Sequence, residues 1–375
     1  MSSSPASQRP RWGTESVRSI NPYVGGRPVS EVARAFGLDP QSIVKLASNE
    51  NPLGMSEAAR QAMIDAALDV PRYPDNDAYA LRQALAAHLG VDASWIVLGH
   101  GSSDILEIAA RALLGEGDSC VYAQYSFIVY ASAVQQRGAR HIVVPAVDFG
   151  HDLPAMARAI EDSTRLVYLA NPNNPTGTLV SPQQLEDFLR SVPPAVAVVL
   201  DEAYVEYLDP QLQRCSLELL RRYPNLVVCR TFSKAYGLAG LRIGYGVAQP
   251  ELADLFHRVR SAFNTSDLAQ AAARAALADQ DFVRRSTELN RAGMRQLEQG
   301  IDALGLQRVP SSGNFLLLRV GDDEQAGARV ARAMLERGVI VRPVDNYGLG
   351  RWLRISVGTE AENRRCLDAL RQALA

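Results

Sequence analysis

Short apolar runs alternate with longer amphipathic stretches over the middle of the chain. Between the runs, apolar residues recur at helical spacing, as at positions 105, 106, 109, 112 and 113. Strands that are apolar on both faces and alternate with helices predict a mostly parallel sheet covered by helices on both sides. The runs that predict strands are Ile96–Leu98, Cys120–Ala123, His141–Val147, Leu166–Leu169, Val196–Leu200, Leu226–Cys229 and Gly244–Val247.

The pattern changes after about residue 262. Helical spacing over 268–277 and 284–304 is followed by a strand at 314–318, a helix at 326–337, strands at 339–341 and 352–357, and a final helix at 362–374. This tail predicts a small α+β domain. The predicted division is therefore a disordered lead-in at 1–17, an arm at 18–48 that forms part of the small domain, a large domain at 49–262 and a small domain at 263–375.

Composition narrows the class of protein. The 375 residues are 47% apolar and 21% charged, and 39 Lys and Arg stand against 41 Asp and Glu. A chain with no basic excess is not expected to bind nucleic acid. No apolar run approaches the ~20 residues that span a bilayer, and the N-terminus lacks a signal-peptide hydrophobic region. The four cysteines have no metal-ligand spacing, so we expect reduced thiols in a cytoplasmic protein and no metal site.

Chemically useful residues follow several of the predicted strands. The glycine-rich turn Gly99–Asp104, Asn174, Asp201 and Lys234 each lie just beyond a predicted strand end. Sites in parallel α/β sheets gather at the carboxyl ends of the strands. A turn with hydroxyl groups before a helix also offers free N–H groups to an anion. The sequence therefore predicts one site to which all four segments contribute.

The stretch from Thr231 to Tyr245 places Lys234 among small hydroxylic residues and glycines, with Arg242 eight positions later. One interpretation is a glycine-rich turn with a solvated lysine. The other is an amine that forms a Schiff base with a carbonyl cofactor. Thr231, Ser233 and Arg242 are then expected to hold the cofactor's phosphate, because arginine presents a planar fork suited to phosphate. The neighbouring strand ends favour the second interpretation.

With these segments in view, residues 18–372 resemble the fold-type I aminotransferases that depend on pyridoxal 5'-phosphate, and within them most closely the histidinol-phosphate aminotransferase group. The resemblance implies an α/β fold with a mostly parallel seven-stranded sheet in the large domain, a small α+β domain, and a homodimer with shared active sites. The segments that carry it are Asn21-Pro22-Tyr23, Lys45–Pro52, Arg72–Asp75, Asn173–Gly177, Asp201–Tyr204, Ser233-Lys234 with Arg242, and Leu353–Gly358.

The resemblance also implies a role for each matching residue. Lys234 bonds the cofactor, Asp201 faces the pyridine nitrogen, and Tyr204 and Asn174 hydrogen-bond the phenolic oxygen. A carboxylate there keeps the ring nitrogen protonated, which makes the ring an electron sink, and the neutral lysine serves as a proton carrier. The expected phosphate ligands are Ser102, Ser103, Thr231, Ser233 and Arg242, with Tyr73 reaching in from the other subunit. Phe127 matches the ring-stacking position, with Tyr125 two residues away as the alternative.

For the substrate, the resemblance implies transamination between histidinol phosphate and 2-oxoglutarate in histidine biosynthesis. Arg354, with Arg342, is expected to bind the substrate phosphate, and Tyr23, Asn49 and Asn314 to line the pocket. Because the same arginine suits a carboxylate, an aromatic amino-acid aminotransferase is the nearest alternative, followed by a decarboxylase of a phosphorylated amino acid. A ligand-sensing domain fused to a DNA-binding winged helix is disfavoured, because about 17 N-terminal residues are too few for such a module.

Overall fold

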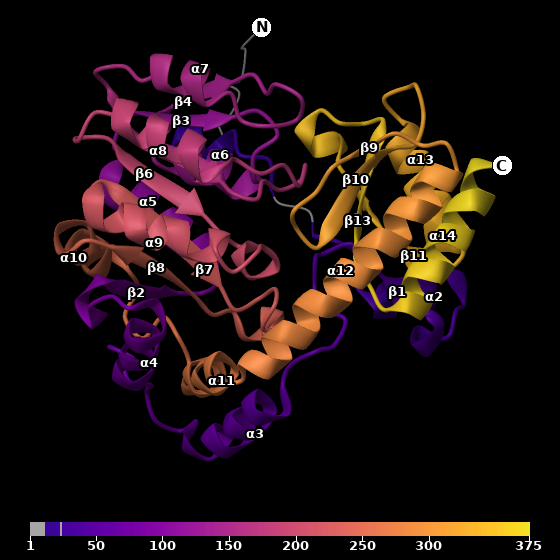
Figure 1. Ribbon diagram of the computed structural model, residues 1–375, viewed down its shortest axis with the longest axis horizontal. Helices are drawn as coiled ribbons and strands as arrows, with labels where there is room; N and C mark the ends of the chain where they lie inside the picture. Colours follow the sequence, from indigo (N-terminus) through magenta and orange to yellow (C-terminus); the bar gives the residue numbers. More distant parts are fainter. Residues whose placement is uncertain (1–11, 23–24) are drawn as a thin grey trace, which may run out of the picture.

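The computed structural model describes residues 12–22 and 25–375. Figure 1 shows a large α/β part and a smaller part beside it, with the long helix α12 (Gln280–Ala303) running between them. The predicted lead-in at 1–17 is described only from Trp12. The short helix α1 (Glu15–Arg18) begins in it, and Gln135 of α6 (Ile128–Gln136) donates a hydrogen bond to the Ser16 carbonyl at 3.2 Å. The end of the lead-in is therefore structured, which corrects that prediction for its last residues.

Seven strands form the large sheet in the order β2-β8-β7-β6-β5-β3-β4. Strand β8 runs antiparallel to β7 and β2, and the pairs among the other strands are parallel. The predicted mostly parallel seven-stranded sheet is confirmed. The strands are β2 (Ile96–Gly99), β3 (Ser119–Ala123), β4 (Arg140–Val144), β5 (Thr164–Ala170), β6 (Ala197–Asp201), β7 (Leu226–Thr231) and β8 (Gly244–Ala248).

Helices cover both faces of this sheet because successive strand residues point to opposite sides. In β6, Val198 and Leu200 join the core under α8 and α9, whereas Val199 joins the core under α5, α6 and α10. Helix α8 begins with a capping box of Ser181 and Gln184. The helices of the large part are α3 (Glu57–Ala66), α4 (Tyr79–Leu89), α5 (Ser102–Leu113), α6 (Ile128–Gln136), α7 (Leu153–Arg158), α8 (Pro182–Ser191), α9 (Leu212–Arg222) and α10 (Pro250–Val259).

The small part has its own antiparallel sheet in the order β12-β13-β10-β9. The N-terminal arm joins this part, because β1 (Val44–Lys45) pairs in parallel with β11 (Val339–Ile340). The arm also contains the helix α2 (Val29–Phe36). The remaining elements are β9 (Arg308–Val309), β10 (Phe315–Arg319), β12 (Arg342–Pro343), β13 (Trp352–Ser356), α13 (Ala326–Glu336) and α14 (Glu360–Leu374).

Helix α11 (Asp267–Ala278) corrects the predicted domain boundary at residue 263. Its buried residues Ala272 and Ala276 belong to the core of the large part, and the helix packs against α3 and α4. The change of core occurs within α12 instead, where Val283 packs with the large part and Leu297 with the small part. The periodicity of an alanine-rich helix shows which face is apolar but not which core that face meets.

None of the helices within the described ranges combines the length and the apolar character that crossing a membrane requires.

Candidate active site

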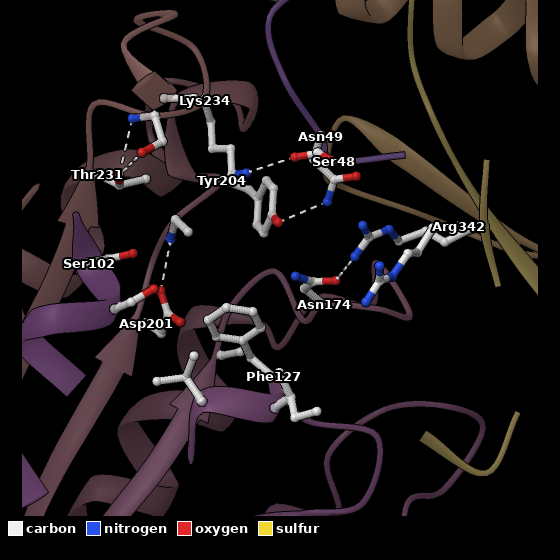
Figure 2. Close-up of a pocket in the computed structure, with 18 of the residues that line it drawn as sticks. Ser48, Asn49, Ser102, Phe127, Asn174, Asp201, Tyr204, Thr231, Lys234 and Arg342 are labelled. Carbon is white, nitrogen blue, oxygen red and sulfur yellow. Dashed lines mark hydrogen bonds between the residues drawn. The ribbon is translucent and has the colours of Figure 1, made fainter. Parts of the chain in front are cut away.

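A cavity of about 520 Å³ lies between the two parts, at the carboxyl ends of the parallel strands. The structure brings Ser102, Asn174, Asp201 and Lys234 together in its wall, so all four predicted strand-end segments contribute to one site (Figure 2). The predicted site residues that line it are Asn49, Ser102, Ser103, Phe127, Asn174, Asp201, Tyr204, Thr231, Ser233, Lys234, Arg242, Arg342 and Arg354.

Lys234 extends into the cavity from the loop after β7. Its Nζ donates a hydrogen bond to the Ser48 carbonyl at 3.2 Å and lies 5.8 Å from the centre of the Tyr204 ring. Burial, reinforced by the charge of Arg354, lowers the pKa of the amine from 10.5 to about 8. A lowered pKa increases the share of neutral amine near neutral pH, and the neutral form is the one that a nucleophilic or proton-carrying lysine uses.

Asp201 ends β6 and is only 5% exposed. Its Oδ2 accepts a hydrogen bond from the Tyr130 hydroxyl at 2.9 Å, and its Oδ1 accepts one from the backbone N–H of Ala203 at 3.2 Å. Burial raises the pKa of the carboxyl group to about 6, although both hydrogen bonds oppose the rise. The sequence prediction missed Tyr130. Its place three residues after Phe127 puts both rings on one helix face, which was the available signal.

Tyr204 and Asn49 form a second hydrogen-bonded unit in the wall. The Nδ2 of Asn49 donates to the Tyr204 hydroxyl at 2.9 Å, and Asn49 is held in turn by the Ser356 hydroxyl at 2.8 Å. Burial raises the pKa of Tyr204 to about 12, so the hydroxyl keeps its proton and remains a donor. Asn314 was expected in the lining, but it lies one layer behind, where its Nδ2 donates to the Asn49 carbonyl at 3.1 Å.

Two arginines from the small sheet line the end of the cavity that lies against the small part. Arg342 of β12 and Arg354 of β13 face each other as direct partners in the antiparallel register, and both line the cavity. Arg354 donates to the Asn174 Oδ1 at 2.5 Å and to the Ala47 carbonyl at 2.8 Å. In Figure 2 the Asn174 amide nitrogen consequently points toward the middle of the cavity. The two guanidinium groups form a cationic end suited to an anion.

The large part supplies a second anion site at the start of α5. Ser102 and Ser103 open that helix, whose first N–H groups have no partner within the helix. The hydroxyls of Thr231 and Ser233 lie 3.0 Å apart, and the Arg242 Nη1 is 3.4 Å from the Ser233 hydroxyl. Four hydroxyl groups, free N–H groups and one guanidinium make a donor set for a phosphate.

Two glycines, Gly101 and Gly244, allow Arg242 and the start of α5 to lie close together. A Cβ at Gly101 would lie 2.5 Å from the Arg242 Nη2, and a Cβ at Gly244 would lie 2.5 Å from the Ser102 nitrogen. Gly101 also has φ +76°, a conformation that favours glycine. The backbone is therefore built so that the guanidinium and the start of the helix converge on the same space.

Three expected aromatic residues occupy different places. Phe127 lines the cavity, whereas Tyr125 stacks on Phe149 with ring centres 6.1 Å apart and does not line it. The geometry therefore favours Phe127 for stacking on a cofactor ring. Tyr73 also lies outside the wall, since it is 82% exposed and stacked on Phe263 at 4.7 Å. Tyr23 falls outside the described residues.

Comparisons with known proteins agree with this geometry. Residues 41–370 match the model of the family described as aminotransferase class I and II. Histidinol-phosphate aminotransferase 2 of Ralstonia nicotianae is 60% identical over 97% of this chain and 98% of its own length. Histidinol-phosphate aminotransferase 1 of Cupriavidus pinatubonensis is also 60% identical, over 97% of this chain and 96% of its own length. The crystal structure of histidinol-phosphate aminotransferase from Sinorhizobium meliloti with pyridoxal-5'-phosphate has a TM-score of 0.90 at 32% identity and covers 98% of both chains.

Proposed function

The chain belongs to the class I and II aminotransferases and depends on pyridoxal 5'-phosphate, and from this premise we propose that it transfers the amino group of histidinol phosphate to 2-oxoglutarate. The products are imidazole acetol phosphate and glutamate. This transfer is a step of histidine biosynthesis. The observation that carries the choice of amino donor is the pair of arginines at the small-domain end of the cavity.

The residues of the cavity fit the cofactor. Gly101 and Gly244 allow Arg242 to lie close to the start of α5, and this leaves a cradle for the phosphate of the cofactor. Asp201 is a buried carboxylate that accepts hydrogen bonds from two neutral donors, Tyr130 and Ala203, which suits a cationic ring nitrogen. Phe127 lies in the wall to cover one ring face. When bound, pyridoxal phosphate supplies an electron sink for the carbon that carries the donor's amino group.

Asp201 and Lys234 have complementary tasks in this mechanism. The Asp201 carboxylate holds a proton on the ring nitrogen, and a charge pair at ~4 Å with an effective dielectric near 20 contributes about 4 kcal/mol. The Lys234 amine would hold the cofactor covalently. As a free and neutral amine, its Nζ would be the base that takes the proton from the donor's amino-bearing carbon. Tyr204 and Asn174 would hydrogen-bond the phenolic oxygen, and Asn49 orients the Tyr204 hydroxyl by donating a hydrogen bond to it.

The arginine pair fits the phosphate of the donor. Like charges directly opposite each other on paired strands are unfavourable, and Arg342 and Arg354 occupy such opposite positions. An anion between them removes the repulsion and accepts several N–H groups at once. A phosphate monoester carries about two negative charges near neutral pH and so matches two arginines better than a single carboxylate. The carboxylates of 2-oxoglutarate use the same end in the second half of the reaction.

The test compares histidinol phosphate with histidinol, which lacks only the phosphate. We expect Arg354→Met to lower kcat/KM for histidinol phosphate at least about 100-fold and to lower the value for histidinol by a much smaller factor. Arg351→Met is the matched control, because Arg351 pairs with Glu324 on the surface at 2.7 Å and does not line the cavity. Full kcat/KM in Arg354→Met, or a wild-type preference for phenylalanine or tyrosine over histidinol phosphate, overturns the proposal.

We also propose that the protein is a homodimer in the cytoplasm, with Tyr73 completing the site of the partner subunit. Supporting this are the exposed apolar residues Leu68, Val70, Tyr73 and Phe263, which are 85%, 58%, 82% and 43% exposed. All four cysteines are free thiols, which suits a reducing compartment. Mixing a Tyr73 variant with a Lys234 variant should restore part of the activity in heterodimers. No recovery after demonstrated subunit exchange contradicts the shared site.

A further inference from the structure

The first turn of α6 reaches the active site at two points. Phe127, the residue before the helix, lines the cavity, and Tyr130 donates its hydroxyl hydrogen to the Asp201 Oδ2 at 2.9 Å. Tyr130 itself does not line the cavity and is fully buried. It can therefore influence a bound cofactor only through the groups that it touches.

Packing fixes the position of the Tyr130 ring. It stacks on Tyr168 with ring centres 4.6 Å apart and an angle of 8° between the planes, and Phe127 meets it edge-on at 6.1 Å. The Tyr168 hydroxyl is anchored separately on the Leu106 carbonyl at 2.6 Å. A hydroxyl on a ring held in this way has one fixed direction, and that direction is toward Asp201.

We propose that Tyr130 is a positioning residue that fixes the Asp201 carboxylate and keeps the proton it shares with the cofactor on the ring nitrogen. The inference rests on the proposed function of Asp201. A hydrogen bond donated to a carboxylate stabilises its charged form and makes it a weaker base. With the bond in place, the carboxylate leaves the proton on the ring, where the electron sink needs it. Without the bond, the proton moves toward the oxygen.

The other groups around Asp201 do not perform this task. Lys234 favours the charged carboxylate and Glu202 disfavours it, both through charge at a distance. The Ala203 N–H donates to the other oxygen, Oδ1. Tyr130 is thus the side-chain donor to the carboxylate among the described residues, and it acts on Oδ2.

The test replaces Tyr130 by phenylalanine, which keeps the ring stack and removes the hydroxyl. The matched control is Tyr168→Phe, which removes a buried hydroxyl from the same stack without touching Asp201. Each purified enzyme is loaded with pyridoxal phosphate labelled with ¹⁵N in the ring, and the nitrogen resonance is recorded without substrate. We expect the signal of Tyr130→Phe to move toward that of an unprotonated pyridine and the signal of Tyr168→Phe to stay at the wild-type position.

Kinetics supply a second readout. We expect Tyr130→Phe to lower kcat about tenfold to a hundredfold with little change in KM, the scale of one lost hydrogen bond to a charged group. In an Asp201→Asn background the same change should have no further effect on kcat, because Tyr130 acts through that carboxylate. An unmoved nitrogen resonance in Tyr130→Phe, or equal losses with and without the Asp201 carboxylate, overturns the proposal. Since the resonance is measured without substrate, this result does not depend on which amino donor the enzyme uses.

Discussion

Asp201 and Glu202 are consecutive acids with the same 5% exposure, yet they have opposite kinds of partner. Asp201 points toward α6 and accepts hydrogen bonds from the neutral donors Tyr130 and Ala203. Glu202 points toward α9, where it accepts a hydrogen bond from Ser216 at 3.0 Å, and it pairs with the buried Arg230 of β7 at 2.8 Å.

The difference separates a charge that serves stability from one that serves function. Glu202 carries its counter-ion within the fold, so its burial is compensated before anything binds. Asp201 has no such built-in ion pair among the described residues, and under the proposed function a cationic ring nitrogen would compensate its buried charge. Removing the partner of Glu202 should therefore destabilise the fold, whereas removing the interaction between Asp201 and the ring nitrogen should lower the reaction rate.

The largest expected effect on stability comes from Arg230→Met. This change leaves the Glu202 carboxylate buried without its counter-ion, which costs about 3–5 kcal/mol of unfolding free energy. Urea unfolding of the cofactor-free protein measures the loss, and kcat per folded molecule should stay near the wild-type value. The control is Arg222→Met, which breaks the surface pair with Glu186 and should cost far less, because exposed ion pairs contribute little to stability. Equal losses in the two variants contradict the comparison.

Asp201→Asn should have the opposite effects, a lower kcat and a higher stability of the cofactor-free protein. The loss of about 4 kcal/mol of interaction with the ring nitrogen lowers kcat about 10³-fold. Stability should instead rise in the cofactor-free protein, because the folded-state pKa of Asp201 is raised from 3.8 to about 6. A raised carboxyl pKa makes the charged form costly, so the wild-type protein carries a penalty of up to about 3 kcal/mol above pH 6 that is absent below its unfolded pKa.

Urea unfolding at a series of pH values checks the sign of this effect. The stability advantage of Asp201→Asn should be absent below pH 3.8, grow as the pH rises to about 6, and remain constant above that. An advantage that is largest at acid pH, or a variant less stable than wild type at pH 8, contradicts the assignment of Asp201 as an uncompensated charge.

The sequence predicted that the strand-end residues converge, but it did not predict the side-chain partners of Asp201 and Glu202. Lys234, Asp201 and Asn174 follow apolar strands, and the carboxyl ends of parallel strands meet at one edge, so the pattern of residues was enough to predict their convergence. The Tyr130–Asp201 hydrogen bond joins residues 71 positions apart, and it depends on how α6 is rotated over the sheet. The Glu202–Arg230 pair depends likewise on β6 and β7 being neighbours. Periodicity shows which face of an element is buried, but not the partner that it meets there.

Ser216→Ala is the smallest change and the sharpest test of the division between the two acids. The Ser216 hydroxyl donates a hydrogen bond to Glu202, as the Tyr130 hydroxyl does to Asp201, and both donors are buried. We expect Ser216→Ala to lower the unfolding free energy by about 1–2 kcal/mol, because Arg230 still compensates the carboxylate. The ring-nitrogen resonance and kcat should stay at their wild-type values, in contrast with those of Tyr130→Phe. If Ser216→Ala moves that resonance, the two sides of the sheet are coupled, and the fold does not separate stability from catalysis at these two residues.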